Sequence, residues 1–487
     1  MTLPAPLVDS VADAHVGSLW IHGLRADGSA TTRPALDGDR DVDVAIVGGG
    51  FSGLWTAHSL VSAEPGLRVA VIEREVVGFG ASGRNGGWAV GELACGFDGY
   101  AKRTSPDAAR RLLHAVFDAV DEIGRVAEAE GIDCRYAKGG WIRVARNQPQ
   151  ADRQRDEVAH ERANGFGPDV LRLLEPDEAR AHFGATDVRG GVFFEPCASL
   201  DPARLAAGLA AACERRGVEI FEGSEAVAID GGSLTVEAGP PGGARRHTVR
   251  AADVVLATEA YTRDLPGRRR DLLPVYSLMV ATEPLAPEVF DELGLAGRPT
   301  FSDDRHMVIY GQRTADDRLA FGGRGVPYLF GSAISAKAEA HLPSHELLGE
   351  TLVELSPLLA DACITHRWGG VLGIPRNWVP GVRLDPVEGA PGRRLGVLGG
   401  YVGEGVAAAN LAGRTMADLI LGRSSTDSDL VDLAWVGQGA RSWEPEPLRW
   451  LGVRSSRRIL SMADDREFRT DRPATAAYKL SRLLRGA

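Results

Sequence analysis

The chain contains 487 residues, of which 44% are hydrophobic and 25% are charged, and its formal net charge is −11 at pH 7. This composition is that of an ordinary globular protein with room for about three domains, and it argues against a disordered or a nucleic-acid-binding chain. The five cysteines lack the spacing of metal ligands or of a disulfide framework, so we expect no metal site and a reduced, cytoplasmic setting.

Residues 1–40 are predicted to form a polar N-terminal arm, which Trp20 and Ile21 could dock onto the rest of the protein. The arm contains no basic segment followed by an apolar one, so a secretory signal is not expected. The most hydrophobic later stretch, residues 396–413, is rich in glycine and contains Glu404 and Asn410. We therefore expect this stretch to be buried core and not a membrane span.

The segment 41–73 is predicted to form a dinucleotide-binding βαβ unit. It contains, in order, an apolar strand at 42–47, the glycines Gly48, Gly50 and Gly53, an apolar-periodic helix, a second strand at 69–72, and Glu73. In such a unit the first glycine allows a tight turn, the second lets a pyrophosphate approach, and the third packs the helix on the strand. The helix N-terminus faces the phosphates, and the acidic residue accepts a hydrogen bond from a ribose hydroxyl. The complete order of elements favours dinucleotide binding, although a lone glycine motif would be weak in a chain with 60 glycines.

A second glycine cluster, residues 78–87, follows the acidic residue and bears on which dinucleotide is bound. A nicotinamide enzyme has no evident need for this cluster, whereas the wide, rigid ring of a flavin needs backbone that can run close beside it. A flexible surface loop is the alternative interpretation.

The remainder of the chain alternates between helices and strands. A helix at 106–130 has one apolar face and lies far from the glycine motif, so we expect it to open a second domain. Asp201 and Pro202 are expected to begin a helix that runs through Cys213. Strands are expected at 140–144, 191–194, 218–221, 226–229, 234–237, 254–257, 275–281, 307–310 and 319–321, the last three in an antiparallel, β-rich region.

Several motifs resemble those of one family. They are the glycine motif with the run VGFGASGRNGG, and the segments 200–205, 254–261, 318–323, 367–370 and 399–406. Together they resemble the FAD-dependent D-amino-acid oxidase superfamily, which includes sarcosine and glycine oxidases, and most of all its γ-glutamylputrescine oxidase-like branch. The resemblance implies an α/β fold, in which a Rossmann-like FAD-binding domain is interleaved with an α+β substrate domain built on a largely antiparallel sheet. We expect the FAD-binding domain at 41–95, 196–262 and 366–425, the substrate domain at 96–195 and 263–365, and a C-terminal extension at 426–487.

The resemblance and the order of the motifs also imply which residues contact FAD, with the flavin at the boundary between the two domains. They are Gly48, Gly50, Phe51, Ser52, Gly53, Glu73, Arg74, Gly80, Ala81, Ser82, Arg84, Asn85, Gly86, Gly87, Trp88, Val227, Ala257, Thr258, Gly370, Gly400, Tyr401, Gly403, Glu404, Gly405 and Val406. The helix that begins near Gly405 is expected to direct its positive dipole at the flavin pyrimidine. Arg84 could offset phosphate or flavin charge, or it could lie in an exposed loop.

Amine oxidation by a flavin needs a site with aromatic or apolar walls and no catalytic triad, because the cofactor carries the difficult chemistry. The candidates for this site are Trp88, Tyr310, Arg313, Trp368 and Trp378. Arg313 could pair with an anionic substrate group or could be a solvated strand residue. Each of Trp368 and Trp378 could equally be a core residue.

The chain departs from amino-acid-oxidising relatives at four positions. Glu404 stands where many members have histidine, Ala407 where sarcosine oxidases have lysine, Leu372 where relatives place arginine, and Asn377 where aspartate is common. The familiar clamps for a small α-amino acid are therefore missing. We expect the FAD to be non-covalent, because Asn85 falls near the position of the histidine that attaches flavin in some relatives.

We therefore expect an FAD-dependent enzyme that oxidises the C–N bond of a primary or secondary amine by hydride transfer to the flavin. The resulting imine would hydrolyse to a carbonyl compound and ammonia or a smaller amine. Dioxygen is the expected electron acceptor, with release of hydrogen peroxide, although the sequence leaves oxidase and dehydrogenase open. A 2-hydroxy-acid oxidase or dehydrogenase on the same fold and a non-catalytic flavin-binding subunit are the alternatives.

Overall fold

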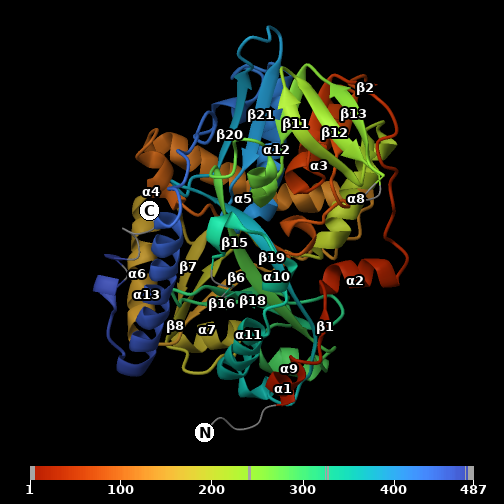
Figure 1. Ribbon diagram of the computed structural model, residues 1–487. Helices are drawn as coiled ribbons and strands as arrows, with labels where there is room; N and C mark the ends of the chain where they lie inside the picture. Colours follow the sequence, from red (N-terminus) through yellow and green to blue (C-terminus); the bar gives the residue numbers. More distant parts are fainter. Residues whose placement is uncertain (1–5, 240–242, 324, 326–327, 478, 481–487) are drawn as a thin grey trace.

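The computed structural model describes residues 6–239, 243–323, 325, 328–477 and 479–480. Figure 1 shows two β-sheets in different halves of the molecule, with the six-stranded sheet in the upper half and the nine-stranded sheet in the lower half. Strands from separate parts of the chain meet in each sheet, because the chain crosses between the halves several times. The mixed α/β architecture predicted from the sequence is confirmed.

The six-stranded sheet is mainly parallel and is covered on both faces. Its order is β10 (Glu219–Phe221), β4 (Val69–Ile72), β3 (Val44–Val47), β14 (Asp253–Leu256), β21 (Arg394–Gly399) and β20 (Gly381–Pro386), with only β20 antiparallel to its neighbour. Side chains alternate along each strand, so Val44 and Ile46 pack against helices while Ala45 and Val47 pack against a small sheet on the other face.

Helices and a four-stranded sheet supply these two covers. The helices are α3 (Phe51–Ala63), α8 (Pro202–Arg215) and α12 (Gly405–Ile420), and the small sheet consists of β11 (Ser224–Asp230), β12 (Ser233–Ala238), β13 (Arg245–Arg250) and β2 (Arg40–Asp41). The side chain of Asp201 caps α8 by accepting from the N–H groups of Ala203 and Arg204, as its sequence predicts.

The nine-stranded sheet is mixed and is built from more distant segments. Its order is β1 (His15–Val16), β19 (Ile364–Pro375), β15 (Leu272–Thr282), β18 (Leu319–Gly323), β17 (Ile309–Arg313), β16 (Thr300–Asp303), β6 (Trp141–Ala145), β8 (Gly190–Phe194) and β7 (Leu171–Leu174). A separate hydrophobic core lies between this sheet and the helices α1 (Pro6–Ser10), α7 (Pro176–His182), α9 (Pro287–Glu292) and α11 (Leu342–Leu355). The remaining elements named in Figure 1 or used below are α2 (Leu19–Ala26), α4 (Gly96–Ala101), α6 (Gln148–Ala163), α10 (Ala336–Glu339) and the short pair β5 (Trp88–Val90) and β9 (Cys197–Ser199).

Helix α5 (Pro106–Glu130) has the bounds that its apolar pattern predicts. Ser105 caps its first turn, and Gly131, with φ of 67°, ends it in the left-handed region. The apolar face of this helix packs with α8 and α12 in the core beside the six-stranded sheet.

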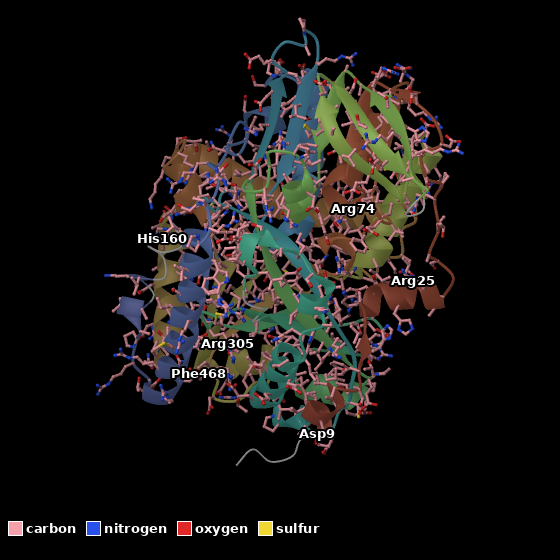
Figure 2. The ribbon with its side chains drawn as sticks, viewed as in Figure 1. Asp9, Arg25, Arg74, His160, Arg305 and Phe468 are labelled. Carbon is pink, nitrogen blue, oxygen red and sulfur yellow. The ribbon has the colours of Figure 1, made fainter. Side chains whose placement is uncertain are left out.

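The described segments nearest to the two ends of the chain pack on the rest of the protein. The arm adds β1 to the edge of β19, and the indole N–H of Trp20 donates to the carbonyl of Asn85 at 2.9 Å. At the other end, α13 (Leu448–Thr470) lies against α6, where Arg153 pairs with Glu467 at 2.8 Å. Figure 2 shows Arg305 and Phe468 together where α13 meets the nine-stranded sheet, and the guanidinium carbon lies 5.2 Å from the ring centroid.

Over the described part of the chain, none of the helices has both the length and the apolar character needed to cross a membrane.

Candidate active site

A cavity of about 800 Å³ runs from the glycine motif at the start of α3, between the two large sheets, to β17 and the C-terminal helix α13. Most of the residues predicted to contact a cofactor line this cavity. They are Gly48, Gly50, Phe51, Ser52, Glu73, Arg74, Gly80, Ala81, Ser82, Arg84, Asn85, Gly86, Trp88, Val227, Ala257, Thr258, Gly370, Tyr401, Gly403, Glu404, Gly405 and Val406. Three others, Gly53, Gly87 and Gly400, lie behind its wall.

The glycine motif packs so closely against its neighbours that none of its three glycines could carry a side chain without a shift. Gly48 has φ of 110°, and a Cβ atom there would lie 2.6 Å from the carbonyl oxygen of Ala257. A Cβ at Gly50 would lie 2.8 Å from Oγ of Ser82. A Cβ at Gly53 would lie only 2.1 Å from the carbonyl oxygen of Gly48, so this glycine sets the close packing of α3 on β3 and does not face the cavity.

Glu73 lies at the end of β4, beside the first glycines. Its carboxylate accepts hydrogen bonds from the N–H of Gly49 at 2.7 Å and of Glu75 at 2.8 Å, and burial raises its pKa. A carboxylate held in this way next to a cavity can accept a further hydrogen bond from a ligand hydroxyl.

The second glycine cluster is fixed by its own polar side chains. Asn85 donates to the carbonyls of Ala81 and Ser82 and accepts from the N–H of Gly87 at 2.7 Å, so it braces the loop from within. The guanidinium of Arg84 donates to Glu339 of α10 at 2.6 Å and to the hydroxyl of Tyr261 at 3.1 Å. The charge of Arg84 is therefore balanced by the protein, which ties this loop to the nine-stranded half.

A buried carboxylate holds the two sheets together beside the start of α12. Glu259 follows β14 with φ of 45°, and it accepts from the N–H groups of Gly373 at 2.6 Å, Gly400 at 2.9 Å and Tyr401 at 3.3 Å. Gly373 belongs to β19, whereas Gly400 and Tyr401 follow β21, so one side chain joins the ends of strands from both large sheets. Burial raises the pKa of Glu259 to about 7.

Aromatic rings form the part of the cavity that lies toward the nine-stranded sheet. The ring of Trp88 lies 5.5 Å from that of Trp141 and 5.8 Å from that of Tyr310, measured between centroids. The Tyr310 hydroxyl shares a hydrogen bond of 2.7 Å with Ser277, and burial raises its pKa to about 12, so it remains a neutral phenol. These rings give the cavity an apolar wall of the kind predicted for amine oxidation.

Of the five predicted substrate residues, Trp88, Tyr310 and Trp378 line the cavity, and Trp368 and Arg313 do not. Trp368 is 2% exposed and donates its indole N–H to the carbonyl of Arg84, so it supports the loop from behind. Arg313 pairs with Asp317 at 2.7 Å and lies over the ring of Phe290, on the far side of the sheet from the cavity wall. Because side chains alternate along β17, Tyr310 and Arg313, which are three positions apart, point to opposite faces of the sheet.

Several cavity residues were not predicted from the sequence. Glu92 comes two residues after β5 and Trp141 begins β6, and neither belongs to a motif with fixed spacing. Glu259 lies in the motif 254–261 but was not named as a site residue. The C-terminal extension, in which no motif was found, contributes Trp443, Val453, Ser456, Arg457 and Leu460.

The part of the chain that the structure describes contains no group of histidines, cysteines and carboxylates suited to a metal ion. The glycine motif, the carboxylate of Glu73 at the end of β4 and the long cavity suit instead an extended dinucleotide with a wide ring at one end.

Comparison with known proteins agrees with this geometry. Residues 43–419 match the profile of the DAO family, described as FAD dependent oxidoreductase. The chain is 33% identical to a probable oxidoreductase, OrdL, of Haemophilus influenzae over 80% of this chain and 85% of that protein. It is 30% identical to the γ-glutamylputrescine oxidoreductase of Escherichia coli over 78% of this chain and 84% of that protein. The crystal structure of glycine oxidase from Geobacillus kaustophilus has a similar fold, with a TM-score of 0.64 and 22% identity over 82% of this chain and 99% of the other.

Proposed function

Because the chain belongs to the DAO family of FAD-dependent oxidoreductases, we propose that it binds FAD non-covalently and oxidises the C–N bond of a primary or secondary amine. The observation that carries this proposal is the single cavity that joins the dinucleotide-type glycine motif to an aromatic pocket. One end suits a cofactor and the other suits a small organic substrate.

The residues present fit FAD. Gly48 and Gly50 would admit the pyrophosphate at the N-terminus of α3, and Glu73 would accept from a ribose hydroxyl. The backbone of the second glycine cluster and Gly370 would run beside the ring system. The side-chain hydrogen bonds of Asn85 are made within the loop itself, and residues 369–373 of β19, the part that runs beside the cavity, contain no histidine or cysteine for covalent attachment.

FAD, when bound, would take up a hydride equivalent from the carbon that bears the amine, leaving an imine that water converts to a carbonyl compound and ammonia or a smaller amine. The chain's own residues would hold and shield the substrate. Trp88, Trp141 and Tyr310 form an apolar wall that would shield the substrate from water. The N-terminus of α12, at Gly405, would place its positive dipole beside the cofactor ring.

Two observations support an amine as the substrate. The γ-glutamylputrescine oxidoreductase relative is named for an amine substrate, and the arginines that line this cavity are already bound to acceptors of the protein. A 2-hydroxy acid would need a free cation for its carboxylate, which makes an amine the better match. We further propose dioxygen as the electron acceptor, with hydrogen peroxide as the reduced product.

The purified protein provides the test. Its absorption spectrum before and after acid precipitation shows whether flavin is bound and whether it is released, and release is expected. Adding amines without oxygen should bleach the flavin, and admitting air should restore the colour and form peroxide. If flavin is bound but no amine bleaches it, amine oxidation is refuted and a non-catalytic flavin-binding role takes its place.

A further inference from the structure

Two carboxylates of the cavity, Glu92 and Glu404, have no partner among the residues that the structure describes. Glu92 follows β5, and Glu404 immediately precedes α12. Among the residues that the structure describes, none donates a hydrogen bond to either side chain or forms an ion pair with it, and Oε2 of Glu404 is buried from solvent. A buried carboxylate without a donor is costly, so such a pair calls for a ligand or for protonation.

The other charged groups of the cavity differ, because each has an acceptor or donor in the protein. The arginines pair as Arg74 with Asp264, Arg84 with Glu339, Arg143 with Glu157, Arg305 with Asp303, and Arg457 with the carbonyl of Gly325. The acids are held likewise: Glu73 and Glu259 accept from backbone N–H groups, Glu225 lies near Arg74, and Asp304 pairs with Arg153. In the described part of the wall, Glu92 and Glu404 are therefore the carboxylates that are left without a hydrogen-bond donor or an ion pair.

Arg143 is the cation whose field acts on Glu92, but it cannot serve as the counter-ion. It pairs with Glu157 and, at 3.4 Å, with Asp304, which also binds Arg153; Arg153 in turn binds Glu467. Two guanidinium groups thus already face three carboxylates, so this network has no positive charge to spare for Glu92.

The two carboxylates also act on each other. Burial raises the pKa of Glu92 to about 7. Burial and, second, the negative charge of Glu92 raise the pKa of Glu404 well above its ordinary value. Ionising both Glu92 and Glu404 is therefore unfavourable, and a cation placed between the two carboxylates removes this penalty.

Aromatic faces complete the surroundings. Trp88 and Trp141 line the same cavity as both carboxylates, and their rings lie 5.5 Å apart. Tyr310 lies beyond Trp88, and its neutral hydroxyl is bound to Ser277. Carboxylates combined with aromatic faces are the surroundings that bind an organic ammonium ion.

We propose that Glu92 and Glu404 bind a second, non-reacting cationic nitrogen, so that the substrate is a diamine or polyamine. This inference rests on the amine oxidation proposed above. The reacting nitrogen must lose its proton before the adjacent carbon is oxidised, and a pair of carboxylates would hold it as an ammonium. The pair therefore suits the nitrogen that keeps its charge throughout the reaction.

The first experiment compares butane-1,4-diamine with pentylamine, in which a methyl group replaces one ammonium group at nearly the same length. The rate of flavin bleaching in the absence of oxygen is measured over a range of each amine's concentration. The diamine should half-saturate the holoenzyme at a concentration at least about tenfold lower, as expected for a charge-assisted hydrogen bond. Glu92→Gln and Glu404→Gln should each remove most of this difference by raising the half-saturating concentration of the diamine, while the exposed control Glu388→Gln changes the half-saturation of neither amine.

The second experiment measures binding without turnover. Holoenzyme whose flavin has been reduced with dithionite cannot oxidise an amine, so calorimetric titration with butane-1,4-diamine reports binding alone. Wild type and Glu388→Gln should bind it, and both Glu92→Gln and Glu404→Gln should bind at least about tenfold more weakly. The melting temperatures of the variants show that each is folded before it is titrated.

The outcomes separate the two proposals. If both amines bleach the flavin with equal half-saturation and the glutamine variants leave the diamine unaffected in both experiments, the diamine inference is overturned and amine oxidation stands. If no amine bleaches the flavin of any variant, amine oxidation itself is refuted. A diamine preference that disappears in both glutamine variants supports the inference.

Discussion

Glu259 offers a quantitative test of how the two sheets are held together around the cavity. Its carboxylate accepts from Gly373 with one oxygen and from Gly400 and Tyr401 with the other. Glu259→Ala leaves three N–H donors without acceptors, each worth about 1–3 kcal/mol where water cannot reach. Water that enters the cavity can recover part of this, so we expect a loss of roughly 3 kcal/mol in the free energy of unfolding.

Glu259→Gln tests the two oxygens of the carboxylate separately, because it replaces one of them with an NH₂ group. The amide oxygen can keep Gly400 and Tyr401, but an NH₂ group would then face the N–H of Gly373, so we expect a loss of about 1–3 kcal/mol. Urea unfolding with FAD in excess, followed by tryptophan fluorescence, measures both losses, with the exposed Glu388→Gln as the control. The role given to Glu259 is refuted if Glu259→Ala unfolds within about 0.5 kcal/mol of wild type.

Three further changes test other parts of the structure. Gly53→Ala places a Cβ 2.1 Å from the carbonyl oxygen of Gly48, so we expect α3 to shift and the free energy of unfolding to fall by about 1–3 kcal/mol or more. The purified variant should also show less visible flavin absorbance per chain, and a normal flavin content would contradict this prediction. Arg84→Ala breaks the pair with Glu339 and should lower stability by about 2 kcal/mol, measured by the urea midpoint, whereas an unchanged midpoint would show that the loop is held without it. The pKa of His366 is lowered to about 4 by burial and by His22 and Arg318, so its contribution to stability is full above pH 6.5 and is lost as the pH falls toward 4. Between these values wild type should lose at most about 3 kcal/mol that His366→Gln does not lose, and parallel pH profiles of the two proteins would refute this.

The structure was predicted most accurately where the residues that determine a turn, a helix or a strand lie within one short segment of the sequence. The unit from β3 to β4 was predicted because turn, helix and strand are consecutive and each glycine has a local task. Helix α5 was also predicted with its true bounds, since capping and periodicity are local properties. Its packing partners were not, because an apolar face does not specify which other face will cover it.

The candidate site was predictable in its cofactor half and much less so in its substrate half. Glycine positions are dictated by backbone geometry, which the sequence expresses directly. The wall of the substrate half depends instead on which way each side chain points along distant strands. Tyr310 and Arg313 lie on the same strand, β17, yet only Tyr310 reaches the cavity. Glu92 and the residues of α13 reach it through tertiary packing alone.

The order of strands in the six-stranded sheet has a consequence for synthesis of the protein. β14 lies between β3 and β21, and these three strands are separated by about 200 and 140 residues of chain. The edge of β3 beside its glycine motif stays unpaired until β14 has been made, and the edge of β14 stays unpaired until β21, which ends at residue 399, has emerged from the ribosome. Loading of the cofactor is therefore a late event, and the nascent chain is most exposed to aggregation and to chaperones before it occurs.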